Sequence, residues 1–202
     1  MAEFPIELVW PMISAAVLMM ILVWLIFAVA AKKILPSLLI GSALVVWLGS
    51  ALLLAPSGFF LKVSLSSIPN IGLLFVPMII GLTILARSAA FQKVVDNLYQ
   101  PWVIGVQVMR MMGASFLSLY ARGLMPAEFA IPSGVGDVFV GITAPLVALV
   151  LFLSPTIGRK MAIVWNIFGF AELSVAIATG FATSPTAYQF LALDNPNALL
   201  FS

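Results

Sequence analysis

The chain has 202 residues, of which 63% are hydrophobic and 8% are charged, and its mean hydropathy is +1.21. A soluble domain of this length cannot bury so much apolar surface, so the composition indicates an integral membrane protein. The net charge of +2 comes from nine Lys and Arg that are scattered rather than gathered into a stripe, which argues against a nucleic-acid partner.

The sequence contains neither cysteine nor histidine. Without cysteine the chain has no disulfide, thiolate nucleophile or cysteine-ligated cluster, and without histidine it lacks the usual haem and copper ligand and the commonest general base. We therefore expect no cofactor, no bound metal and no catalytic residue.

Six apolar segments are each near or above the roughly 20 residues that cross a hydrocarbon core about 30 Å thick. Together they predict an all-α bundle of six spans that forms a single transmembrane domain over residues 1–202. The first segment has no basic residue before it, and its positive charges follow it, so it predicts a retained helix rather than a signal peptide. The approximate bounds are Leu8–Ala31, Ile34–Ala55, Ile68–Ala86, Trp102–Ala121, Ile131–Leu153 and Met161–Ala182.

The loop cations favour an N-terminus on the outer side of the membrane, because that orientation collects most of them in the cytoplasm. The cytoplasmic loops then hold Lys32, Lys33, Arg87, Lys93, Arg159 and Lys160. The outer loops hold Lys62 and Arg122. We therefore predict a multi-pass protein of a bacterial-type cytoplasmic membrane.

The first three spans carry no ionisable residue at membrane depth, which is typical of a scaffold. In the second span Ser37 and Gly41 form a step of small residues that allows close helix contact. After the third span, Phe91 and Val94 recur at helical spacing opposite polar residues. Residues 88–100 thus predict a short amphipathic helix on the cytoplasmic surface, ended by Pro101, that acts as a linker or docks a partner.

The fourth span places Gln107 and Arg110 on one face, with Gly113 next along it. At about 1.5 Å per residue, Arg110 lies roughly 12 to 14 Å from the cytoplasmic end, near the midplane. A charge at that depth is rare and usually belongs to an internal pair, a water-filled cavity or a pathway.

The sixth span places Glu172 about 16 Å from the same end, so it lies at nearly the depth of Arg110. Asn166 and Gly169 precede it in steps of three residues. Ala176 and Gly180 follow it in steps of four, which predicts a closely packed face that turns the carboxylate into the bundle.

The fifth span holds Asp137 among Gly134, Gly136 and Gly141, on the side of that helix best suited to close packing. Counted from Ile131, Asp137 lies roughly 9 Å below the outer boundary, shallow enough to reach outer water.

Two interpretations of these charges stay open. In the first, Arg110 and Glu172 only pair, with Gln107 and Asn166 completing the hydrogen bonds, and so fix the register of two helices. In the second, Asp137 adds a second carboxylate against one cation, and the five residues form a ligand or proton site in which Asp137 exchanges the proton.

The residues from Arg110 to Gly141 include Gly-Leu-Met-Pro-Ala-Glu-Phe-Ala-Ile-Pro-Ser-Gly-Val-Gly-Asp137. Together with Asn166-Ile-Phe-Gly-Phe-Ala-Glu172, this run resembles uncharacterised bacterial polytopic membrane proteins of about seven helices and no assigned activity. The resemblance covers the second half of the chain. It implies an aspartate where Glu172 stands, and a seventh helix that this chain lacks.

The leading functional hypothesis is a protein that binds or transports a small solute or proton through a polar site among spans four to six. The alternative is a non-catalytic accessory subunit whose charges only pair helices, with a membrane-protein partner or a second copy beside it. An enzyme acting on lipid is a third class, but no nucleophile and metal set supports it. In each case the lipid bilayer is the surrounding partner.

Overall fold

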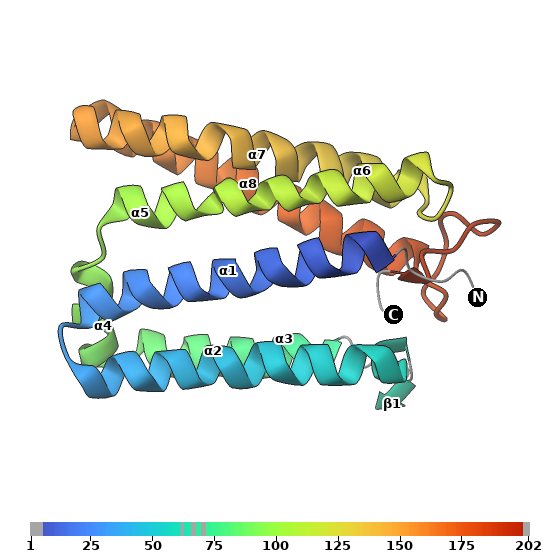
Figure 1. Ribbon diagram of the computed structural model, residues 1–202, viewed down its shortest axis with the longest axis horizontal. Helices are drawn as coiled ribbons and strands as arrows, with labels where there is room; N and C mark the ends of the chain where they lie inside the picture. Colours follow the sequence, from blue (N-terminus) through green and yellow to red (C-terminus); the bar gives the residue numbers. More distant parts are fainter. Residues whose placement is uncertain (1–5, 62, 66–67, 70–71, 200–202) are drawn as a thin grey trace. The chain divides into compact units, whose positions relative to one another are not determined.

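The computed structural model describes residues 6–61, 63–65, 68–69 and 72–199, and this part is almost entirely helical (Figure 1). The first half contains α1 (Ile6–Ala31), α2 (Ile34–Leu54), α3 (Gly72–Ala86) and α4 (Ala89–Asp96). Between α2 and α3 lie the 3₁₀ turns η1 (Ala55–Ser57) and η2 (Phe59–Leu61) and the antiparallel strands β1 (Val63–Leu65) and β2 (Ile68–Pro69). The second half contains α5 (Gln100–Gly105), the 3₁₀ helix η3 (Val106–Gly113), α6 (Ala114–Ala121), α7 (Ala127–Leu153) and α8 (Pro155–Thr183).

Within the described residues, five helical stretches are long and apolar enough to cross a membrane, as expected of an all-helical membrane protein. They are Trp10–Ala31, Ile34–Leu54, Gln100–Ala121, Ala127–Leu153 and Pro155–Thr183. The third predicted span, Ile68–Ala86, is not confirmed at its full length. Ile68 pairs with β1 instead of starting a helix, and α3 has 15 residues, or about 22 Å.

The helix starts also differ from the prediction in the second half of the chain. The fifth span begins at Ala127, four residues before the expected Ile131, after Pro126 in an extended conformation. The sixth begins at Pro155 rather than Met161, since proline is well accommodated in the first turn of a helix. Both helices are therefore longer than hydropathy alone indicates.

The predicted amphipathic helix is α4, and it is shorter than residues 88–100. Ser88 caps its start, where the Ser88 hydroxyl accepts a hydrogen bond from the Phe91 backbone N–H at 3.4 Å. The helix ends at Asp96, and Pro101 does not terminate it. Pro101 lies instead in the first turn of α5, where its missing N–H costs no intrahelical bond.

Residues 20–99 form one compact unit, in which the helices bury little surface. No residue of α2 is buried, so its apolar side chains are available to lipid. The small residues predicted on α2 do allow close contact with a neighbouring helix, because the indole N–H of Trp24 on α1 donates to the Ser37 carbonyl at 2.9 Å. A Cβ atom at Gly41 would lie 2.7 Å from that indole nitrogen.

Residues 6–19 and 100–199 form the second compact unit, and α7 packs there against α8 and against the α5–η3–α6 segment (Figure 1). One buried apolar cluster comprises Ile104, Val140, Ala144, Val147, Leu151, Ala162 and Trp165. A second comprises Leu119, Met125, Phe129, Ala130 and Leu199. The charged residues predicted as a site all belong to this unit.

After α8 the chain folds back onto the end of that helix. The backbone N–H groups of Phe190 and Leu191 both donate to the Ala182 carbonyl, and that of Asn197 donates to the Thr183 carbonyl at 2.8 Å. Residues 200–202 lie outside the described part of the chain.

Candidate functional site

The candidate site is built on η3, the 3₁₀ stretch in the middle of the span Gln100–Ala121. Side chains three residues apart eclipse one another in a 3₁₀ helix, so Gln107, Arg110 and Gly113 form one row. Gly141 on α7 allows η3 to approach closely. A Cβ atom at position 141 would lie 2.6 Å from the Met111 backbone nitrogen.

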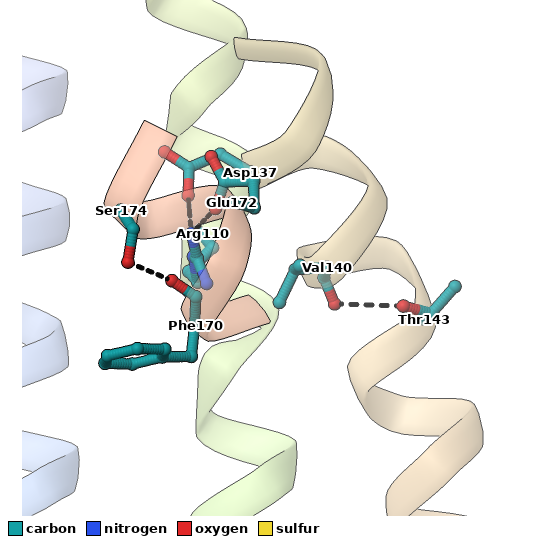
Figure 2. A network of polar contacts seen from close by, with 7 residues as sticks. All are labelled: Arg110, Asp137, Val140, Thr143, Phe170, Glu172 and Ser174. Carbon is teal, nitrogen blue, oxygen red and sulfur yellow. Dashed lines mark hydrogen bonds and ion pairs between the residues drawn. The ribbon is translucent and has the colours of Figure 1, made fainter. Parts of the chain in front are cut away.

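The guanidinium of Arg110 lies between two carboxylates that come from different helices (Figure 2). Its Nε donates to Asp137 Oδ1 on α7 at 2.6 Å, and its Nη2 lies 2.6 Å from the same oxygen. Nη2 also donates to Glu172 Oε2 on α8. We call these three residues the charge triad, and they join η3, α7 and α8.

The charge triad is largely withdrawn from the surface. The side chains of Arg110, Asp137 and Glu172 are 15%, 22% and 7% exposed, respectively. Glu172 Oε1 is buried and has no hydrogen-bond partner within the described residues. With two carboxylates and one guanidinium, the triad carries one excess negative charge when both acids are ionised.

Glycines make room for both carboxylates of the triad. A Cβ atom at Gly113 would overlap the aspartate side chain, and one at Gly136 would overlap the glutamate. A Cβ atom at Gly169 would lie 3.5 Å from the Nη1 atom of the guanidinium. The glycines predicted to pack helices therefore also shape the space that holds the charges.

The remaining predicted packing residues lie along the same interfaces. A Cβ atom at Gly134 on α7 would lie 2.7 Å from Leu117 Cγ on α6. On α8, Gly180 is buried and Ala176 is half-buried. The face of α8 that carries Glu172 is thus packed along much of its length.

Asn166 and Gln107 do not complete the network as expected. Asn166 is exposed, and its amide donates to the Ala162 carbonyl of its own helix at 2.8 Å. Two three-residue steps separate Asn166 from Glu172, and each falls short of a turn by about 60°, which rotates Asn166 away from the site. The Gln107 side chain forms no hydrogen bond with any residue that the structure describes.

Asp137 lies deeper than the sequence indicates. Because α7 begins at Ala127 rather than Ile131, Asp137 is about 15 Å from the start of its helix, not about 9 Å. That extra depth brings the aspartate level with Arg110 and makes it part of the triad. The expected depth of roughly 9 Å below the outer boundary is therefore too small.

One family model matches the chain. It is described as "Domain of unknown function (DUF8737)", and the match covers residues 68–194. The chain belongs to this family. A search of curated proteins finds no match, and a search of solved structures finds none either. The resemblance to bacterial seven-helix proteins stays a prediction.

The DUF8737 region begins at β2 and includes the whole charge triad, whereas α1 and α2 precede it. Inside this region the structure adds a polar contact that the sequence reasoning missed. The Trp165 indole N–H on α8 donates to Thr143 Oγ1 on α7 at 2.8 Å. Trp165 precedes Glu172 by seven residues, or two helical turns, so both lie on one face of α8. That spacing could have indicated that Trp165 faces α7.

The DUF8737 region also contains a buried hydroxyl that the sequence reasoning missed. Ser133 on α7 is 1% exposed, and its Oγ has no partner in the described part of the chain. Across the described residues, no group of three or more Asp or Glu side chains is placed to hold a metal ion.

Three of the clefts on the described surface are lined by no member of the charge triad. One lies between α1 and α2, and it is lined by residues that include Trp24 and Gly41. The second lies at the turn between α7 and α8, beside Arg159 and Lys160. The third lies between the start of α7 and the segment that follows α8, beside Glu128.

Proposed function

We propose that this membrane protein binds or transports a small solute or proton through the charge triad, and that a proton is exchanged there. The observation that carries the proposal is the position of Arg110 between Asp137 and Glu172. An excess negative charge in an apolar interior is costly. The uptake of one proton makes the triad neutral, so the arrangement favours proton binding.

Proton binding at the triad is coupled to helix packing. Each carboxylate holds η3 to a different helix through a charge-assisted hydrogen bond, and neutralising one carboxylate weakens that contact. A 3₁₀ stretch in the middle of a helix often marks a hinge, and Arg110 lies within one. These features suit a transporter, in which ionisable groups at membrane depth move protons or bind solutes.

A second candidate is the accessory subunit, with a membrane-protein partner or a second copy beside it. Two observations favour it: each carboxylate already contacts Arg110, and the three clefts at the helix ends and between α1 and α2 lie elsewhere. In that case the triad only fixes the register of η3, α7 and α8.

We also propose six crossings with the N-terminus outside, in a bacterial-type cytoplasmic membrane. The loop cations support this orientation. Arg122, after α6, donates to Glu7 at the start of α1, so both lie on one side of the membrane. An even number of crossings must separate them. Because α1, α2 and the α5–η3–α6 segment supply three, this pair supports α3 as the fourth crossing.

Proton flux into sealed vesicles tests the proposed function. The purified protein is reconstituted in liposomes that contain a pH-sensitive dye, and an outside acid pulse is applied with a potassium ionophore present. We expect the parent to acidify the lumen, and Asp137→Asn and Glu172→Gln each to fall to the rate of empty liposomes. The control is Glu128→Gln, which removes an exposed carboxylate at the start of α7. Equal flux in parent and empty liposomes would favour the accessory subunit.

A further inference from the structure

Two buried oxygen atoms on facing helices lack hydrogen-bond partners among the described residues. They are Oε1 of Glu172 on α8 and Oγ of Ser133 on α7. Burying a polar atom without a partner costs free energy, and such atoms in proteins are usually satisfied by a neighbour or by an enclosed water. The contacts of Arg110 supply a hydrogen-bond partner to neither oxygen.

Gly136 places these two atoms in the same part of the α7–α8 interface. A Cβ atom at Gly136 would lie 2.9 Å from Glu172 Oε1. Ser133 is three residues earlier on α7, and residues at that spacing have Cβ atoms about 5 to 6 Å apart on one face. The Ser133 hydroxyl is therefore within reach of Oε1 through a single water, or directly after a rotamer change.

The contacts of the two carboxylates with Arg110 are unequal. Asp137 Oδ1 accepts from Nε and lies 2.6 Å from Nη2 as well, whereas Glu172 contacts only Nη2. Glu172 is also the more buried of the two, with 7% of its side chain exposed against 22% for Asp137. Close contacts with a cation and exposure to solvent both favour the ionised form of a carboxyl. Asp137 has more of each.

We propose that Glu172 takes up the proton of the triad on Oε1, and that Ser133 accepts the hydrogen bond from this proton, directly or through one water. This inference rests on the proton-exchanging site proposed above, and it replaces Asp137 as the exchanging group. The proton comes from water and binds Oε1, while Oε2 continues to accept from Arg110. The charged groups that face Glu172 are Arg110 from η3 and Asp137 from α7.

Isotope-edited infrared spectroscopy of the full chain in lipid tests this assignment. At neutral pH exposed carboxyls are ionised, so a protonated-carboxyl band there comes from the buried site. Two samples of the parent are compared, one with carbon-13 in the carboxyl of every glutamate side chain and one with it in every aspartate. We expect the band to move to lower frequency with labelled glutamate only. Movement with labelled aspartate would assign the proton to Asp137 and overturn the inference while leaving the proposed function intact.

The role of Ser133 is tested on the same band. Ser133→Ala removes the hydrogen-bond acceptor, and we expect the band to rise in frequency. Ser133→Thr retains the acceptor and should leave the frequency unchanged. If Ser133→Ala does not fold, Ser133→Cys keeps the size with a weaker acceptor and should also raise the frequency. Ser174→Ala is the matched control, because the Ser174 hydroxyl donates to the Phe170 carbonyl of its own helix (Figure 2).

The outcomes separate this inference from the function on which it rests. If the parent has no protonated carboxyl at neutral pH, both the proposed function and the assignment to Glu172 fail. If the glutamate-sensitive band is present but Ser133→Ala and Ser133→Cys leave its frequency unchanged, Ser133 is not the partner of the proton.

Discussion

Gly136 on α7 lies so close to Glu172 on α8 that a methyl group at position 136 would overlap the glutamate side chain. A methyl group at position 113 on η3 would likewise overlap the side chain of Asp137 on α7. Each carboxylate thus reaches Arg110 through space that a glycine leaves open. The small residues and the buried charges form a single arrangement, and a change in one must disturb the other.

We expect Gly136→Ala to destabilise the protein in detergent. The added methyl group overpacks the interface and displaces Glu172 from Arg110, at a cost of about 1 to 3 kcal/mol for the overpacking alone. Gly49→Ala is the matched control, because no atom lies within 4 Å of a Cβ placed at Gly49. The control should be neutral or stabilising by up to about 1 kcal/mol. Equal thermal unfolding of the two variants would contradict the close contact at Gly136.

We expect Thr143→Val to loosen the α7–α8 interface, because Trp165 loses the acceptor of its indole N–H. Hydrogen bonds between membrane helices contribute about 0.6 to 2 kcal/mol, and Thr143→Ser should retain the contribution. The measurement is the free energy of unfolding in mixed micelles. Thr179→Val is the control, since the Thr179 hydroxyl bonds only to carbonyls of its own helix. The expectation fails if Thr143→Val is no less stable than the control.

We expect Arg110→Gln to be the most damaging single change in the triad. It leaves two carboxylates without a cation, and loss of one partner of a buried ion pair costs about 3 to 5 kcal/mol. Glu172→Gln should cost less, because Arg110 keeps Asp137. The double variant should recover only part of the folded yield, since Asp137 remains unpaired. Full recovery in the double variant would favour the accessory subunit.

The proximity of Arg110 and Glu172 could be predicted from the sequence, because the rise of a helix converts residue spacing into distance along the helix. The depth of Asp137 could not. The start of α7 depends on Pro126 and Ala127, which precede the apolar run, and hydropathy places the boundary four residues too late. An error of one helical turn was enough to give Asp137 a shallower predicted depth than Arg110.

Other features depend on contacts between segments, which local patterns do not record. The 3₁₀ stretch around Arg110 lies where the backbone of η3 meets Gly141. Strand β2 falls at the start of the predicted span Ile68–Ala86, whose hydropathy continues into α3. Asn166 has a polar side chain at a suitable depth, but rotation along α8 carries it off the face of Glu172.

The Glu7–Arg122 pair should make stability depend weakly on pH. The hydrogen bond from Arg122 holds the pKa of Glu7 below its ordinary value. A carboxyl whose pKa is lowered by folding contributes stability above its unfolded pKa, and that contribution is lost as the pH falls through the folded pKa. Parent and Glu7→Gln should therefore differ in melting temperature at neutral pH and converge in acid. Both side chains are exposed, so the difference should be small and sensitive to salt.

A difference between parent and Glu7→Gln that grows as the pH falls would contradict the sign of this effect.

The Glu7–Arg122 pair also tests the proposed topology. Cysteines introduced in place of Glu7 and Arg122 should both react with an impermeant reagent from one side of sealed vesicles. Labelling from opposite sides would remove the argument that α3 crosses the membrane.

The charge count at the triad is tested most directly by the protonated-carboxyl infrared band at neutral pH. We expect the band in the parent and its loss in both Asp137→Asn and Glu172→Gln, because either change leaves one carboxylate for one guanidinium. Glu128→Gln, which alters an exposed carboxylate, should keep the band. A parent without the band, or a band that persists in both triad variants, would contradict the claim that Arg110, Asp137 and Glu172 share one proton.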